Sequence, residues 1–251
     1  MQAMGMMEFL LLLSSFGSLT GSSRDANAIR RALETRYRHA TTLQADFYER
    51  YSDGKGGGQA ESGTVYFSRP GRMRWDYESP QQKLFLVDGK NVWFYIPADH
   101  TASRAKTRES SDWRTPIALL AGKADLGKLC SNLELVATSN GSAGPRGDAS
   151  RDNGPAVNPL SPADSLLRCT PREASDHSGE ESEDPIRDVL LETDSEAHLV
   201  RVVIRQPGNL ETEFRFGNWQ ENIPISESKF HFEPPPGVEI VDEKKVAGPI
   251  R

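Results

Sequence analysis

Apolar residues recur every four positions in one segment near the start of the chain. Ile29, Leu33 and Tyr37 share this spacing, while arginines occupy the other faces. Such a period is typical of an amphipathic helix with one buried face. The pattern therefore predicts a helix over residues 28–37, with Asp25 as a candidate N-cap.

Beyond this helix the period falls to two. Leu43, Ala45 and Phe47 alternate with polar or hydroxyl-bearing residues, which predicts a strand with one apolar face. The strand ends in the glycine-rich segment 53–58, which we interpret as a hairpin loop. This segment lacks the Gly-Lys-Ser/Thr ending and the following helix of a phosphate-binding loop, so nucleotide binding is not expected there.

Residues 63–97 hold the most informative strand pattern. Four short apolar runs follow one another, at 63–68, 73–77, 84–87 and 91–96. Connections as short as those between them join antiparallel neighbours, so we expect a meander. Alternation gives this meander one continuous apolar face, formed by Val65, Phe67, Met73, Trp75 and Tyr77.

Weaker signals follow along the rest of the chain. Residues 112–122, which include Ile117 and Leu120, predict a short helix with a proline early in it and a glycine at its end. Further segments with a strand pattern are 132–138, 166–171, 189–193, 199–206 and 210–219. The end of the chain predicts a short turn or helix over 226–232 and then a final extended segment.

Two segments have the composition of loops. Residues 139–162 are poor in large apolar residues and rich in Gly, Pro, Ser and Asp, and residues 172–185 are dominated by Glu, Asp and Ser. We expect a single domain over residues 24–251, mainly β with short helices, that carries a low-complexity insertion at about 139–164.

The N-terminus holds an apolar run at residues 9–13 that is too short to cross a bilayer. It resembles the apolar core of a signal peptide, although no Lys or Arg precedes it, and the alternative is the start of a buried helix. We expect residues 1–23 to be a signal peptide cleaved near Ser22 or Ser23, with Ala26–Ala28 as the other candidate site.

Cys130 and Cys169 are the only cysteines. An even pair in an exported chain favours one disulfide, which would close a loop of about 40 residues and contribute up to ~4 kcal/mol. The alternative is two reduced, buried thiols.

Charge and motifs exclude several classes of function. With 30 Lys and Arg against 36 Asp and Glu, the net charge of −6 removes the usual electrostatic basis for binding nucleic acid. The five histidines are scattered singly, so no metal site is expected. There is no Gly-x-Ser-x-Gly motif, and the paired carboxylates lie in the acidic loop without apolar walls, so we expect no enzyme.

The aromatic residues allow two interpretations. They form either an ordinary sheet core or the wall of a cavity, because a wide sheet with one apolar face must be covered by helices or by an apolar guest. The residues concerned are Phe47, Phe67, Trp75, Trp93, Phe94 and Tyr95.

A family resemblance favours the cavity. The ordered motifs are Arg69-Pro70-Gly71, Met73-Arg74-Trp75, Pro80, Asp88-Gly89 and Val92-Trp93-Phe94-Tyr95. Further matches are Leu43-x-Ala45-x-Phe47, Thr115-Pro116-Ile117 through Leu120, and Phe230-x-Phe232-x-Pro234-Pro235-x-Gly237-Val238. In order and spacing this series resembles LolA, the periplasmic outer-membrane lipoprotein carrier family.

The resemblance implies an unclosed antiparallel β-barrel with an α-helical lid that shelters lipoprotein acyl chains. It implies a periplasmic monomer without a cofactor, which receives cargo from the inner-membrane lipoprotein-releasing ABC transporter and delivers it to an outer-membrane receptor. The alternatives on the same half-barrel are a regulatory domain that senses lipoproteins or lipids, and a carrier of another lipid.

Residue roles follow from the same resemblance. Arg69 matches the arginine that holds the lid closed through hydrogen bonds to lid backbone. Lid residues are Leu33, Tyr37, Ile117 and Leu120. Wall residues of the acyl-chain cavity, assigned by strand parity, are Phe47, Val65, Phe67, Met73, Trp75 and Trp93. The insertion and the acidic loop have no counterpart in the family pattern.

Overall fold

The structure is a computed structural model that describes residues 22–107, 120, 125–136, 165–172, 186–243 and 246. Four expectations lie wholly or mostly outside these residues. They are the signal peptide up to residue 21, the helix over 112–122 apart from Leu120, the insertion at about 139–164, and the acidic loop at 172–185 apart from Arg172.

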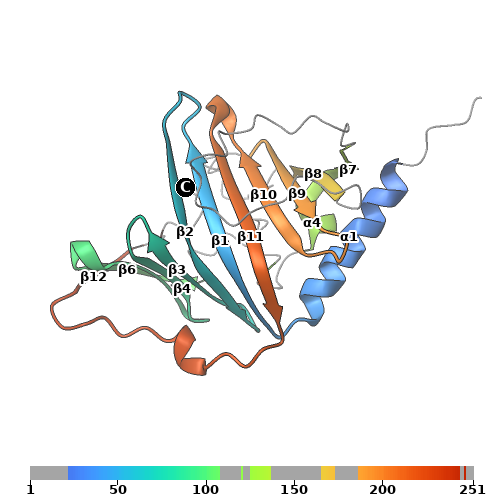
Figure 1. Cartoon of the computed structure of the whole chain (residues 1–251). Coiled ribbons are helices and arrows are strands. Elements are labelled where there is room, and N and C mark those ends of the chain that lie inside the picture. The colour runs from blue at the N-terminus through green and yellow to red at the C-terminus, as the bar shows by residue number, and fades with distance from the viewer. Residues whose placement is uncertain are drawn as a thin grey trace, which may run out of the picture.

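One curved, open sheet of 12 strands carries the fold (Figure 1). Its order is β12-β6-β5-β4-β3-β2-β1-β11-β10-β9-β8-β7, and within it β12 and β6 pair in parallel while the other pairs are antiparallel. The expected mainly β, half-barrel fold is therefore confirmed.

The strands are β1 (Thr42–Ser52), β2 (Gly58–Ser68), β3 (Arg72–Ser79), β4 (Lys83–Val87), β5 (Asn91–Ile96), β6 (Thr101–Lys106), β7 (Cys130–Leu135), β8 (Ser165–Pro171), β9 (Asp188–Thr193), β10 (Leu199–Arg205), β11 (Glu211–Glu221) and β12 (Glu239–Asp242). The helices are α1 (Ser22–His39), α4 (Leu126–Leu129) and the short 3-10 turns η1 (Pro97–Asp99), η2 (Pro207–Asn209) and η3 (Glu227–Phe230).

Alternation along the strands gives the sheet an apolar inner face, defined here as the face that carries the main core. Leu43, Ala45 and Phe47 of β1 point to it, as the period of two predicted. Helix α1 packs on this face through Leu33 and Tyr37, both fully buried. The main core therefore lies between α1 and the sheet.

Helix α1 begins earlier than the sequence predicted. It starts at Ser22, so Asp25 lies in the first turn of the helix and the expectation that it is the N-cap is wrong. Ala26, one residue further on, is fully buried in the main core. The small and polar residues at the start of α1 show no hydrophobic period that would predict a helix. Packing against the sheet extends the helix into this segment.

A second, smaller core lies on the outer face of β4 and β5. Leu84, Leu86 and Trp93 form it with Phe230 of the C-terminal segment. This segment, residues 222–243, leads from the interior strand β11 past η3 to β12 at one edge of the sheet (Figure 1).

Polar contacts fix this C-terminal segment to β3. Arg72 Nη1 lies 2.6 Å from Glu227 Oε2. Arg74 Nη1 donates a hydrogen bond of 3.0 Å to the Lys229 carbonyl oxygen, and the Lys229 ammonium lies over the Tyr66 ring. These contacts explain how β12 is added in parallel beside β6, which the local pattern did not predict.

The outer face of β1, β10 and β11 carries an ion-pair ladder centred on Glu213. Its buried carboxylate lies 2.5 Å from Arg201 Nε, 3.0 Å from Arg215 Nε and 2.9 Å from Arg50 Nη2. Burial alone would raise the pKa of Glu213, but the charges and hydrogen bonds of Arg201 and Arg215 outweigh it and lower the pKa to about 2.

We predict that Glu213→Gln lowers the free energy of unfolding near pH 7 by about 2–3 kcal/mol, because three arginines lose their shared anion. Folding lowers this pKa from 4.5 to about 2, so the contribution is present above pH 4.5 and lost as the pH falls toward 2. Urea titrations at several pH values should show the two proteins converging in acid. Glu239→Gln, at an exposed position, is the control; a pH-independent difference would contradict this account.

Gly63 of β2 leaves no room for a side chain. A Cβ there would lie 1.9 Å from the Asp76 carbonyl oxygen of β3. We predict that Gly63→Ala destabilises the protein by about 1–3 kcal/mol, because backbone of two paired strands must separate. Thermal unfolding beside the Ser62→Ala control tests this, and equal melting temperatures for the two variants would refute it.

Candidate functional site

Aromatic side chains fill the centre of the inner face. Trp75 is fully buried and contacts four phenylalanine rings. The centroid distances from its ring are 4.7 Å to Phe47, 5.7 Å to Phe214, 6.1 Å to Phe216 and 6.3 Å to Phe67, all with tilted or edge-on geometry. Rings prefer this arrangement to face-to-face stacking.

The structure brings most of the predicted site residues into this one core. Buried members are Leu33, Tyr37, Phe47, Val65, Phe67, Trp75 and Leu120, and Met73 packs against them half-buried. Ile117 lies outside the described residues. Trp93 lies in the outer core, so its assignment to the inner wall by parity is wrong.

The physical reason for the error at Trp93 is that β5 is apolar on both faces. Val92 and Phe94 point to the inner core, whereas Trp93 and Tyr95 point to the outer core. The outer face is covered by the C-terminal segment, and Phe232 of that segment contacts Trp93 at 5.4 Å between ring centroids. Parity alone cannot assign a face when both faces are buried.

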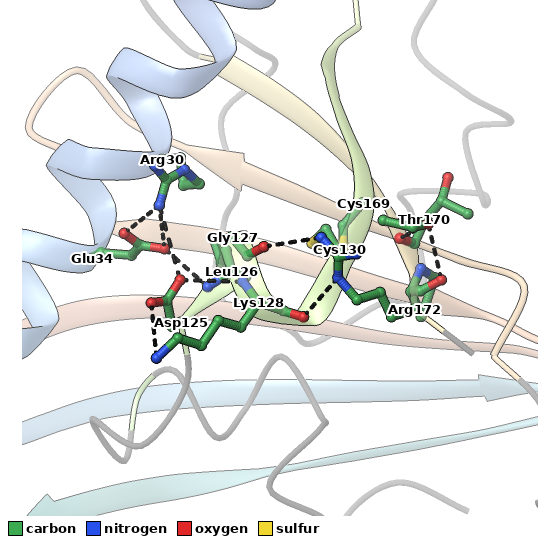
Figure 2. The surroundings of a disulfide bond; sticks show 12 residues. Arg30, Glu34, Asp125, Leu126, Gly127, Lys128, Cys130, Cys169, Thr170 and Arg172 are labelled. Carbon is green, nitrogen blue, oxygen red and sulfur yellow. Dashed lines mark hydrogen bonds and ion pairs between the residues drawn. A yellow bond between two sulfur atoms is a disulfide. The ribbon is translucent and has the colours of Figure 1, made fainter. Parts of the chain in front are cut away.

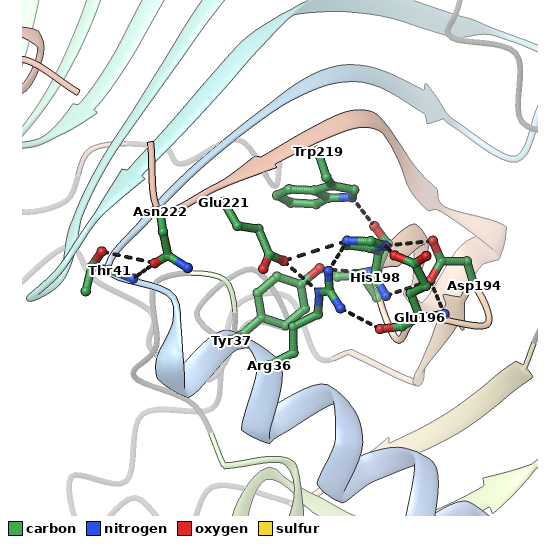
Figure 3. A network of polar contacts seen from close by, with 10 residues as sticks. Arg36, Tyr37, Thr41, Asp194, Glu196, His198, Trp219, Glu221 and Asn222 are labelled. Atoms are coloured by element: carbon green, nitrogen blue, oxygen red, sulfur yellow. Dashed lines mark hydrogen bonds and ion pairs between the residues drawn. The ribbon is translucent and has the colours of Figure 1, made fainter. Parts of the chain in front are cut away.

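The C-terminal end of α1 is fixed by a buried tyrosine (Figure 3). Tyr37 Oη accepts a hydrogen bond of 2.8 Å from the Leu199 backbone N–H, and Trp219 Nε1 donates one of 3.0 Å to the Leu199 carbonyl oxygen. The Tyr37 and Trp219 rings lie 5.8 Å apart. Burial raises the pKa of Tyr37, so the phenol stays neutral.

A polar network beside Tyr37 joins the same end of α1 to β11 and to the β9–β10 turn. Arg36 Nε lies 2.6 Å from Glu221 Oε1, and Arg36 Nη2 contacts His198 Nε2. His198 Nδ1 lies 2.8 Å from Asp194 Oδ2. Because a guanidinium can only donate, His198 Nε2 is the acceptor toward Arg36, and Nδ1 faces the Asp194 carboxylate.

Arg69 contacts the chain directly after α1. Its Nε donates a hydrogen bond of 2.5 Å to the Ala40 carbonyl oxygen, and its backbone N–H donates one of 3.0 Å to Thr41 O. Its Nη2 is buried and has no partner among the described residues. Burial lowers the pKa of the Arg69 guanidinium. The Arg69 guanidinium therefore keeps one buried N–H donor group without a partner among the described residues.

Glu34, in the C-terminal half of α1, joins this helix to α4 (Figure 2). Glu34, buried on α1, accepts hydrogen bonds of 2.8 Å from Arg30 Nη1 and of 2.9 Å from the Leu126 backbone N–H at the start of α4. Cys130 follows α4 and is bonded to Cys169, which joins β7 to β8 with a Cα–Cα distance of 5.4 Å. The disulfide therefore lies next to the contact between α4 and α1.

Sequence reasoning missed the polar residues that position α1. Arg36, Glu34 and His198 appeared as solvent-facing or isolated residues, because their partners lie far away in the chain. Arg36 and His198, for example, are 162 positions apart. No local pattern indicates such pairs.

The described residues contain no cluster of His, Cys, Asp and Glu that could hold a metal ion. Among the same residues, no helix has the length and apolar character needed to cross a bilayer. The chemistry that the inner face offers is chiefly burial of apolar surface. The Trp75 indole and the hydrogen-bonded Tyr77–Glu49 pair are polar groups within it.

Comparison with known proteins agrees with this geometry. Residues 38–140 match the model of the family described as outer membrane lipoprotein carrier protein LolA. The chain is LolA-like. The resemblance indicated by the sequence is thereby confirmed, and the matched region includes β1 to β7, Arg69 and the Trp75 cluster.

Two relatives carry the same description. The outer-membrane lipoprotein carrier protein of Nitrosospira multiformis is 27% identical over 238 residues, 94% of this chain and 95% of the relative. That of Azotobacter vinelandii is 35% identical over 129 residues, 51% of this chain and 60% of the relative. Among solved structures, an uncharacterized conserved protein from Thermus thermophilus shares the fold, with a TM-score of 0.50, 12% identity, and coverage of 87% of this chain and 99% of that chain.

We predict that Tyr37→Phe lowers the free energy of unfolding by about 1–3 kcal/mol, because the buried Leu199 N–H loses its acceptor. Tyr95→Phe is the matched control, since the Tyr95 hydroxyl makes no hydrogen bond within the described part of the chain. Denaturant titration of both variants provides the measurement. Equal losses in the two would mean that the Tyr37 hydroxyl does not fix α1.

Proposed function

We propose that this LolA-like protein carries acylated lipoproteins and shelters their acyl chains between the inner face of the sheet and α1. The resemblance over residues 38–140 supports the proposal, as do the relatives described as lipoprotein carriers. The observation that carries it is the cover of the inner face. Apolar contacts bury one face of α1 from Ala26 to Tyr37, while directional polar contacts act on its C-terminal half and on Ala40 directly after it.

Loading is driven by the removal of acyl chains from water. Each buried methylene contributes about 0.8 kcal/mol, so a long chain would bind tightly and leave slowly. The guest must replace the apolar contacts that Leu33 and Tyr37 make with the sheet. Closure of α1 competes with the guest for the same surface, which weakens net binding and permits onward transfer.

The carrier acts in the periplasm and by binding alone, without a catalytic step. Residues 1–23 direct its export. It receives cargo from the inner-membrane releasing transporter and delivers it to an outer-membrane receptor. Both exchanges require α1 to leave and regain the inner face.

Arg69 stabilises the closed arrangement in this scheme. Its hydrogen bond to Ala40 O holds the C-terminal end of α1, and its unpaired Nη2 offers a further donor to the lid. We predict that Arg69→Leu keeps acyl-chain binding within about threefold of the unmodified protein but slows transfer to an acceptor more than about tenfold, because closure no longer competes with the guest.

Transfer of a fluorescent diacylated lipopeptide from the loaded protein to the purified outer-membrane receptor tests this role. Arg69→Lys should be only partly active, since an ammonium lacks the planar fork of donors. Arg187→Leu, at an exposed position paired with Asp188, serves as the control. Unchanged transfer in Arg69→Leu would remove Arg69 from the mechanism, whereas failure of the unmodified protein to bind the lipopeptide would overturn the proposed function.

A further inference from the structure

The indole of Trp75 differs from the other described indoles in having no hydrogen-bond partner. Trp93 Nε1 donates to Asp88 Oδ2 at 3.2 Å, and Trp219 Nε1 donates to the Leu199 carbonyl oxygen at 3.0 Å (Figure 3). Trp75 Nε1 is buried and no acceptor lies within hydrogen-bonding distance among the described residues. Buried tryptophans usually pair this N–H, because leaving it unpaired costs about 1–3 kcal/mol.

The surroundings of Trp75 explain why the protein itself does not satisfy it. The neighbouring rings all belong to phenylalanines, which offer no acceptor atom. The neighbours along the inner face of β3 are Met73 and Tyr77, and the Tyr77 hydroxyl donates to Glu49 at 2.9 Å. A water molecule needs two to four polar partners in a buried site, and the indole provides one.

The donor therefore lies on the surface that the proposed guest would occupy. A plain hydrocarbon chain would fit against the phenylalanines but would leave the N–H unpaired, as it is in the closed arrangement. An ester- or amide-linked acyl chain carries a carbonyl oxygen at the head of its apolar part. This oxygen can accept a hydrogen bond from the Trp75 N–H.

We infer that Trp75 Nε1–H donates a hydrogen bond to an acyl carbonyl oxygen of the bound guest. The inference rests on the proposed function and deepens it, because it makes Trp75 a residue that recognises acyl groups rather than apolar chains in general. The hydrogen bond also fixes how deep the acyl chain enters. The aromatic rings then supply non-directional contact to the methylenes beyond the carbonyl.

Three lipid probes test the inference on the full protein. The first is a lipopeptide with two ester-linked palmitoyl chains on a glyceryl-cysteine, the second is its ether-linked counterpart, and the third is an ester-linked phospholipid. Spectra of protein with 15N-labelled indoles report on each tryptophan separately. The Trp75 indole proton should shift downfield with the ester lipopeptide but not with the ether one, while Trp93 stays in place as an internal reference.

A phenylalanine substitution gives the matched affinity test. Trp75→Phe keeps an aromatic ring and removes the N–H, so it should weaken ester-lipopeptide binding roughly 2- to 12-fold and ether-lipopeptide binding less than about twofold. Trp93→Phe makes the same change in the outer core and should alter neither affinity. If Trp75→Phe does not fold, the indole shift in the unmodified protein decides the question.

Four outcomes separate the possibilities. A shift with the ester lipopeptide alone supports the inference with lipoprotein as the source of the carbonyl, and a shift with both ester probes supports it with free lipid as a second source. Binding of the ester and ether lipopeptides without a shift of Trp75, or equal losses for both in Trp75→Phe, would overturn the inference while the proposed function stands. Failure of every probe to bind would overturn both.

Discussion

Burial of the apolar face of α1 in the core that it shares with the inner face of the sheet is the interaction on which the other features depend. An open sheet with an apolar inner face is stable in water only when something covers that face. Leu33 and Tyr37 of α1 belong to this core together with Trp75 and its phenylalanine neighbours, and the Tyr37 ring contacts Trp219 of β11. Because apolar burial has no preferred direction, another apolar group of similar size can replace the helix there.

The contacts at the margins of this core have the opposite character. Hydrogen bonds from Arg69 to Ala40, from Leu199 to Tyr37 and from Leu126 to Glu34 need particular distances and angles. In the proposed function they return α1 to one position after it has moved. Non-directional apolar contacts along α1, together with directional polar contacts on its C-terminal half, fit the carrier role proposed above.

The outer face of the sheet is organised differently. One part carries the arginine ladder around Glu213, and another is covered by the C-terminal segment through Phe230. The ladder consists of charged groups, which prefer contact with water. The C-terminal segment instead packs into the outer core and extends the sheet with β12.

Local sequence determined the strands β1 to β5 and the inward direction of Phe47, Phe67 and Trp75, because side chains alternate between the faces of a strand. The family motifs added Arg69. Only the tertiary structure decided that Trp93 faces outward and that His198 accepts from Arg36, since both depend on segments distant in sequence. The hydrophobic period of a segment specifies which of its residues share a face. What covers that face, and which polar groups meet there, depends on packing between segments that are distant in the sequence.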